Sequence, residues 1–82
     1  MQLDVLTPDK KVFSGEAVAV RFPGSEGSFE VLNNHAPIIS TLDKGYVSIR
    51  TGSEEKKFLI DGGIVEVLNN KIIVLAESVI SE

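Results

Sequence analysis

Residues 64–77 read IVEVLNNKIIVLAE, and this stretch decides the fold class. Val65 and Val67 precede a central Asn69–Asn70 pair, and Ile72 and Val74 follow it with the same spacing of two. A period of two among β-branched residues is typical of half-buried strands. Asparagine tolerates the backbone angles of a two-residue hairpin turn. The stretch therefore predicts a β-hairpin.

The same alternation recurs along the rest of the chain. Four further runs show it, at residues 3–7, 16–22, 46–51 and 56–60. Clusters of Gly, Pro, Asn and Asp lie between the runs, and these residues favour turns. Such clusters occur at residues 7–9, 23–27, 43–45, 51–53 and 62–63. No segment has the 3.6-residue period of a helix. We predict an all-β fold, a small antiparallel β-sandwich or flattened barrel of about 8–10 short strands, in one domain over residues 1–82.

Several of the predicted strands have apolar residues on both faces. Leu32 adjoins Val31, and Ile73 and Leu75 flank Val74; Leu6 likewise follows a buried-face valine. A strand in a small sandwich has one inner face, so a second apolar row calls for an explanation. Either part of the outer surface meets a partner, or strand ends wrap over the edge of the sandwich. The residue pattern leaves both interpretations open.

Composition excludes several classes of function. The chain has 82 residues, a formal net charge of −4 and no cysteine. The negative charge argues against electrostatically driven binding to nucleic acid. The absence of cysteine excludes disulfides, thiolate zinc sites and thiol nucleophiles, and fits a reducing compartment. The first residues, MQLDVLTPDKK, lack the pattern of a signal peptide, and no apolar run approaches the roughly 20 residues of a membrane helix. Any connection to a membrane is therefore expected through another protein.

No residue pattern indicates a site of chemistry. His35 is the only histidine, and a lone histidine in a loop is more often structural than catalytic. A metal site needs more ligands than one histidine and dispersed carboxylates. The turn at residues 24–27 could present amides to an anion, but no helix follows it and Glu26 repels anions. We predict no catalytic, cofactor-binding or metal site, and a chain that acts by binding other proteins.

A carrier domain is the alternative function. Lipoyl and biotinyl carrier domains are acidic β-sandwiches of similar size that display one lysine at a hairpin tip, and Asp43–Lys44–Gly45 resembles the centre of a lipoyl attachment turn. The acidic residue that usually precedes this pair is Leu42 here. An ordinary Asp-Lys-Gly turn is the favoured interpretation.

Two long stretches resemble a known family. Residues 23–49, PGSEGSFEVLNNHAPIISTLDKGYVSI, and residues 58–77, FLIDGGIVEVLNNKIIVLAE, are similar to the β-sandwich domain of the epsilon subunit of F-type ATP synthase, whose mitochondrial counterpart is called delta. LDVLTP near the start, FSGE, the GSEG turn, HAP and the final VLAE follow in the order of that family. The combination spans nearly the whole chain and is highly specific.

The resemblance implies a non-catalytic central-stalk subunit that rotates with gamma and couples ion-driven rotation, usually proton transport, to ATP synthesis without a cofactor. By position, one loop would contact the c-ring: Gly24, Ser25, Glu26, Gly27 and Ser28. Some relatives have an acidic residue where this chain has Ser28. Thr7, His35 and Ser40 would lie on or near the side facing gamma. The protein would be peripheral on the cytoplasmic face of the bacterial inner membrane, attached only through the complex.

Many bacterial and chloroplast relatives continue into a C-terminal helical hairpin that can restrain ATP hydrolysis. The present sequence reaches ESVISE, residues 77–82, where those helices would begin. The resemblance therefore covers the sandwich domain without the C-terminal helical hairpin.

Overall fold

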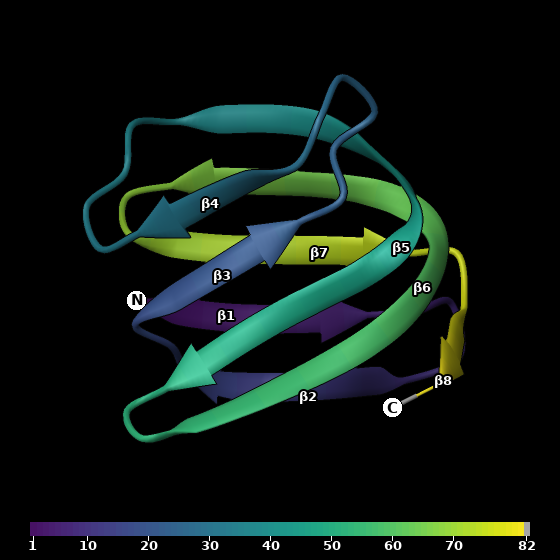
Figure 1. Cartoon of the computed structure of the whole chain (residues 1–82), viewed down its shortest axis with the longest axis horizontal. Helices are drawn as coiled ribbons and strands as arrows, with labels where there is room; N and C mark the ends of the chain where they lie inside the picture. The colour runs from purple at the N-terminus through teal and green to yellow at the C-terminus, as the bar shows by residue number, and fades with distance from the viewer. Residues whose placement is uncertain (82) are drawn as a thin grey trace.

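The structure, a computed structural model, describes residues 1–81. These residues form eight β-strands joined by turns and loops, with no helix (Figure 1). The strands are β1 (Gln2–Leu6), β2 (Lys11–Glu16), β3 (Ala19–Phe22), β4 (Phe29–Leu32), β5 (Ile38–Thr51), β6 (Glu54–Leu68), β7 (Lys71–Ala76) and β8 (Val79–Ser81). The predicted all-β class is confirmed. Two of the strands are long rather than short, because β5 has 14 residues and β6 has 15.

The strands form one continuous sheet that folds over on itself. Its order is β2-β1-β7-β6-β5-β3-β4, and β8 pairs with β6. Residues 38–42 of β5 pair with residues 63–67 of β6, whereas residues 44–51 pair with residues 54–61. The two long strands therefore belong to both layers of a sandwich (Figure 1). Layer A contains β2, β1, β7 and the paired segment 38–42 with 63–67. Layer B contains β4, β3, β8 and the other halves of β5 and β6.

The two layers meet at a corner built around Gly62 and Gly63 in β6. Gly62 has a φ of 115°, which side chains rarely adopt. A Cβ on Gly63 would clash with the carbonyl oxygen of Leu75 and lie 3.0 Å from the Cα of Ala76. Residues 43–45 and 62–63 were predicted to be turns between strands. They are instead bends inside two long strands, because glycine lets a strand coil sharply without ending.

The position of Lys44 at this bend argues against the alternative function, a lipoyl or biotinyl carrier domain. Lys44 lies within β5 and pairs with Asp61 of β6. It is not at a hairpin tip, so it lacks the exposed turn that a lipoyl or biotinyl attachment lysine occupies. Asp43–Lys44–Gly45 is therefore similar to an attachment turn in sequence but not in structure.

The predicted hairpin at Asn69–Asn70 is confirmed. It joins β6 to β7, and its two asparagines have φ values of 52° and 60°. One pairing differs from the antiparallel expectation, since β1 and β7 run parallel. Strands that are distant in sequence are not constrained by a tight turn, so period two alone does not determine their direction.

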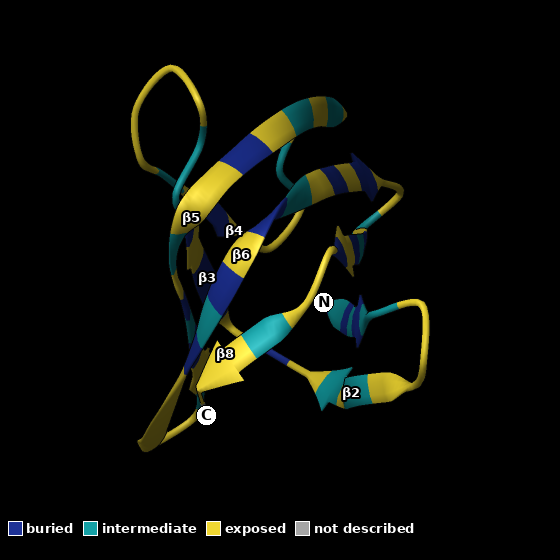
Figure 2. Ribbon diagram, turned by 90° about the vertical axis from the view of Figure 1, so that its right-hand side faces the viewer, coloured by how far each residue is buried: buried dark blue, intermediate teal, exposed yellow. Residues whose placement is uncertain are grey.

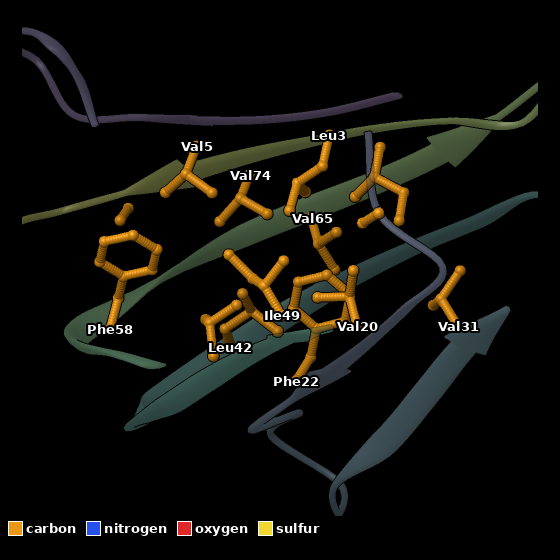
Figure 3. Packing of buried hydrophobic residues seen from close by; sticks show 14 of the residues in the cluster. Leu3, Val5, Val20, Phe22, Val31, Leu42, Ile49, Phe58, Val65 and Val74 are labelled. Atoms are coloured by element: carbon orange, nitrogen blue, oxygen red, sulfur yellow. The ribbon is translucent and has the colours of Figure 1, made fainter. Parts of the chain in front are cut away.

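The core lies between the two layers. Val5, Val65 and Val74 point inward from layer A, and Phe22 and Ile49 do so from layer B (Figure 3). Buried and exposed residues alternate along β5 and β6, as Figure 2 shows. All buried side chains among the described residues are apolar. The inner rows thus account for the stability of the sandwich through removal of apolar surface from water.

Candidate functional site

The five residues predicted to contact the c-ring lie together on the β3–β4 loop. This loop projects as an exposed hairpin in Figure 2. The backbone N–H of Ser25 donates to the Thr41 carbonyl at 3.0 Å, and that of Asp43 donates to the Pro23 carbonyl at 2.8 Å. The Ser25 hydroxyl donates to the Asp43 carboxylate at 2.9 Å and accepts from the Thr41 hydroxyl at 2.9 Å. These bonds hold the loop against β5 while Glu26, Gly27 and Ser28 remain exposed.

Two glycines give this loop its shape for different reasons. A Cβ on Gly24 would lie 2.5 Å from the Gly27 carbonyl oxygen and 2.8 Å from the Phe29 ring. Gly24 is therefore required by close packing. Gly27 has a φ of 124°, and a Cβ there would meet nothing within 4 Å. Gly27 is required by its backbone angle, and a side chain at this position would point into solvent.

The three residues predicted to face gamma lie apart from one another. Ser40 lies in the first half of β5, at the margin of layer A. Thr7 follows β1, which is three strand intervals or about 14 Å from β5 in the same layer. His35 lies in the loop before β5, where its Nδ1 is 2.8 Å from the Ala36 carbonyl oxygen. They lie around layer A and do not form a single cluster.

The outer face of layer A carries a group of exposed apolar side chains. The sequence indicated some of these residues but not that they lie on one surface. The strand register places Ile39, Glu66 and Ile73 side by side across β5, β6 and β7. The next outward row contains Ile64, Leu75 and Leu6 across β6, β7 and β1. Ile39 is 72% exposed and Leu75 is 51% exposed. We call this surface the apolar face; its members are Leu6, Ile39, Ile64, Leu68, Ile73 and Leu75, with Glu66 among them.

The apolar face explains most of the second apolar row noted in the sequence. Leu6, Ile73 and Leu75 lie on the outer surface of layer A, where the register places Leu6 beside Leu75 and Ile73 beside Glu66. Leu32 is separate, because it lies on β4 in layer B and is 50% exposed. A contiguous exposed apolar surface is typical of an interaction site.

The outer face of layer B is different in kind. It carries charges of both signs, although Leu32 and Tyr46 are also exposed there, at 50% and 54%. Ala19 and Ser48 line a hollow on this face. The charged residues around this hollow are Arg21, Glu30, Arg50, Glu55 and Lys57. Mixed charges of this kind are typical of a surface that stays in water. Layer A is therefore the face suited to docking.

Comparison with known proteins identifies the family. The whole chain, residues 1–82, matches the family described as ATP synthase, Delta/Epsilon chain, beta-sandwich domain. The chain belongs to this family. The ATP synthase epsilon chain of Leptospira interrogans is 39% identical over 77 residues, which cover 94% of this chain and 61% of the relative. That of Chlorobium limicola is 42% identical over 79 residues, which cover 95% of this chain and 90% of the relative.

Solved structures show the same fold as this epsilon-type domain. A chain from the central stalk and c-ring structure of the Tetrahymena thermophila mitochondrial ATP synthase has a TM-score of 0.85 at 23% identity, and the match covers 98% of this chain and 65% of that chain. A chain from the Euglena gracilis mitochondrial ATP synthase has a TM-score of 0.89 at 20% identity, covering 96% and 51%. The chain spans about three-fifths of the length of the Leptospira relatives it matches.

Two polar arrangements in this epsilon-type domain escaped sequence reasoning. The amino group of Met1 donates to Asn33 Oδ1 at 2.8 Å and to the Ala17 carbonyl at 3.0 Å, and pairs with Glu16 at 3.3 Å. No periodicity or turn signal marks such a contact, because it joins residues that are 16 and 32 positions apart.

The second arrangement surrounds Asp4 on β1. The Ser14 hydroxyl donates to Asp4 at 2.6 Å, and the Gln2 amide donates at 3.2 Å. The hydrogen bond from Ser14 is the main cause that lowers the pKa of the Asp4 carboxyl below its usual value. Ser14 lies opposite Asp4 on the adjacent strand β2, so the register had to be known to find this contact, whereas Gln2 is two residues before Asp4 on β1.

Residues 1–81 contain no group of three or more His, Asp or Glu side chains arranged to hold a metal ion. Among these residues there is also no helix of a length and hydropathy that could cross a membrane.

Proposed function

We propose that this chain is a non-catalytic central-stalk component of an F-type ATP synthase that binds gamma, contacts the c-ring and couples ion-driven rotation to ATP synthesis. The observation that carries the proposal is the apolar face of layer A in a member of the delta/epsilon family. Relatives named ATP synthase epsilon chain and fold neighbours from ATP synthase structures support it. The coupling would be mechanical, with no bond made or broken in this domain.

Gamma is the proposed occupant of the apolar face. A stable contact needs to bury about 1,000 Å² or more, and apolar area removed from water contributes most of its affinity. Thr7, His35 and Ser40 lie around the layer that bears this face, where polar contacts set orientation more than affinity. The mixed charges of layer B would then face water.

The β3–β4 loop, Gly24 to Ser28, is the proposed contact with the c-ring. Its hydrogen bonds to Thr41 and Asp43 hold it in one conformation before it binds, which lowers the entropy cost of docking. Glu26 is the only charged residue of the loop. A pair between Glu26 and a basic residue of the ring would contribute roughly 0–1 kcal/mol, so it would fix orientation rather than hold the complex.

The proposed location follows from the proposed complex. Bacterial relatives named ATP synthase epsilon chain support a place on the cytoplasmic face of the bacterial inner membrane. The chain would be peripheral there and would reach the membrane only through the c-ring and gamma.

Binding to purified gamma tests the proposal. Ile39→Asp places a charge in the apolar face, and Ile80→Asp is its matched control because Ile80 is exposed on β8, outside that face. We expect Ile39→Asp to weaken gamma binding at least about tenfold, since an unpaired buried charge is costly, and Ile80→Asp to leave it unchanged. Isothermal titration calorimetry measures the dissociation constant for gamma, and only variants with the same thermal stability as the wild type are compared. A correctly folded wild-type chain that does not bind gamma would refute the proposal.

A further inference from the structure

Glu66 lies in an apolar surrounding on the outside of the domain. Along β6 the neighbouring outward positions are Ile64 and Leu68. Across the adjacent strands, its partners in register are Ile39 on β5 and Ile73 on β7. All four nearest outward positions are therefore aliphatic, and the carboxylate lies in the middle of the surface proposed to dock.

Asp4 offers a direct comparison within the same row. Ile73 pairs with Glu66 on one side and with Asp4 on the other, so the two acidic residues are two strands apart. Asp4 accepts hydrogen bonds from Ser14 and Gln2. The carboxylate of Glu66 accepts no hydrogen bond and forms no ion pair within residues 1–81. Asp4 is hydrogen-bonded within the chain, whereas Glu66 has no such partner among residues 1–81 and its exposed carboxylate is open to water.

Docking on the apolar face removes that water. A carboxylate that loses its hydration without a partner carries a large desolvation penalty, whereas a cation in good geometry offsets it. Lys71 is the nearest cation of the chain itself, because Leu68 pairs with Lys71 and places it diagonally from Glu66 on the same face. These two residues form no ion pair among the described residues, which leaves the position over Glu66 open to a partner.

We infer that the partner surface on layer A carries an arginine or lysine that pairs with Glu66 at the centre of an otherwise apolar contact. This inference rests on the proposed function, in which the partner is gamma, and it names the chemistry that gives that contact its register. Apolar contact alone is non-directional, so a single buried charge pair is what would fix how the two surfaces are aligned. Arginine suits the role best, because its planar group can bind both carboxylate oxygens.

The test measures binding of purified gamma to Glu66→Gln and to Glu66→Leu. Glu55→Gln is the matched control, since Glu55 lies on the charged face of layer B. Removing one member of a buried charge pair weakens binding by roughly thirtyfold or more, so we expect both Glu66 variants to lose at least that much. Glu55→Gln is expected to stay within about twofold. Equal binding by Glu66→Gln, or tighter binding by Glu66→Leu, would overturn the inference.

Two further variants locate the cation. Glu66→Arg should abolish binding to wild-type gamma, and one gamma variant with a single Lys or Arg replaced by Glu should restore it. Lys71→Gln should bind like the wild type; if it weakens binding as much as Glu66→Gln does, the partner of Glu66 is Lys71 and the inference fails. A wild-type chain that binds no gamma refutes the proposed function itself, whereas wild-type binding with an indifferent Glu66 refutes only the inference.

Discussion

Gly63→Ala probes the corner on which both layers depend. The new Cβ would overlap the Leu75 carbonyl oxygen and lie 3.0 Å from the Cα of Ala76 and 3.2 Å from the Leu75 carbonyl carbon. Carbon atoms in ordinary contact are about 3.5–4.0 Å apart, so β6 and β7 must separate by roughly 0.5–1 Å. The atoms in conflict are backbone atoms of a neighbouring strand, which cannot turn aside as a side chain can.

The expected cost follows from the ladder between β6 and β7. Gly63 pairs with Ala76 and Ile64 pairs with Leu75. A hydrogen bond stretched by that separation passes beyond the usual limit of about 3.2 Å. Losing one or two such bonds, at about 1 kcal/mol each, and leaving a buried group without a partner, at about 1–3 kcal/mol, gives a total of roughly 3 kcal/mol. A domain of this length has about 4–12 kcal/mol of stability in all.

Gly52→Ala is the matched control for this experiment. Gly52 has a φ of 71° and its Cβ would meet nothing within 4 Å, so alanine there costs only the left-handed backbone term of about 1–2 kcal/mol. Urea unfolding followed by circular dichroism gives the free energy of unfolding of both variants by linear extrapolation. We expect Gly63→Ala to be the less stable by at least about 1 kcal/mol. Equal urea midpoints for the two variants would show that close packing at Gly63 does not stabilise the corner.

Three other perturbations test the remaining surfaces. Gly27→Val strains the backbone by roughly 1–3 kcal/mol at an exposed tip, so proton pumping by the assembled enzyme should fall while the isolated domain still folds; an unfolded domain would show the turn to be structural. His35→Ala should weaken gamma binding by about threefold to tenfold, as a contact at the rim does, with the rate of any chemical step unchanged; a collapse of that rate with binding intact would assign the imidazole a catalytic role. Asp4→Asn should make the loss of stability below about pH 4 less steep. A carboxyl whose pKa is lowered by folding stabilises the folded state at pH values above its pKa in the unfolded chain, and this stabilisation is lost as the pH falls through its folded pKa. An Asp4→Asn variant with the same decrease in unfolding free energy at acid pH as the wild type would exclude this contribution.

The period-two pattern was sufficient to predict the hairpin and strand segments in β1, β3, β5, β6 and β7, because these depend on nearby residues, but the predicted runs did not include β2, β8 or residues 38–42 of β5. Asn69 and Asn70 supply the left-handed angles of the turn, and the flanking valines supply the buried rows. The inward or outward direction of the side chains in β6 and β7 follows from the same alternation, whereas in β3 the adjacent Ala19 and Val20 are both buried. These features required no knowledge of which strands lie side by side.

Features that depend on long-range pairing could not be predicted in this way. Gly62 and Gly63 mark a turn or a corner equally well in a sequence, and only the continuous pairing of β5 with β6 distinguishes the two. The parallel pairing of β1 with β7 joins opposite ends of the chain. For the same reason, the sequence showed that Ile73 is a second apolar residue next to the buried Val74. It did not show that Glu66 lies beside Ile73 on the adjacent strand, or that Ile39 lies beside Glu66.

The two proposed docking surfaces are connected through one strand. Thr41 and Asp43 of β5 hold the β3–β4 loop by backbone and side-chain hydrogen bonds. Ile39, two residues before Thr41 on the same strand, belongs to the apolar face. Two residues of extended strand span about 7 Å, and β5 is paired with β6 over this segment. A force applied to the loop therefore reaches the apolar face through a short, hydrogen-bonded strand without crossing a flexible linker. That arrangement suits a domain that transmits rotation between two partners, because neither contact can move independently of the other without breaking the ladder between β5 and β6.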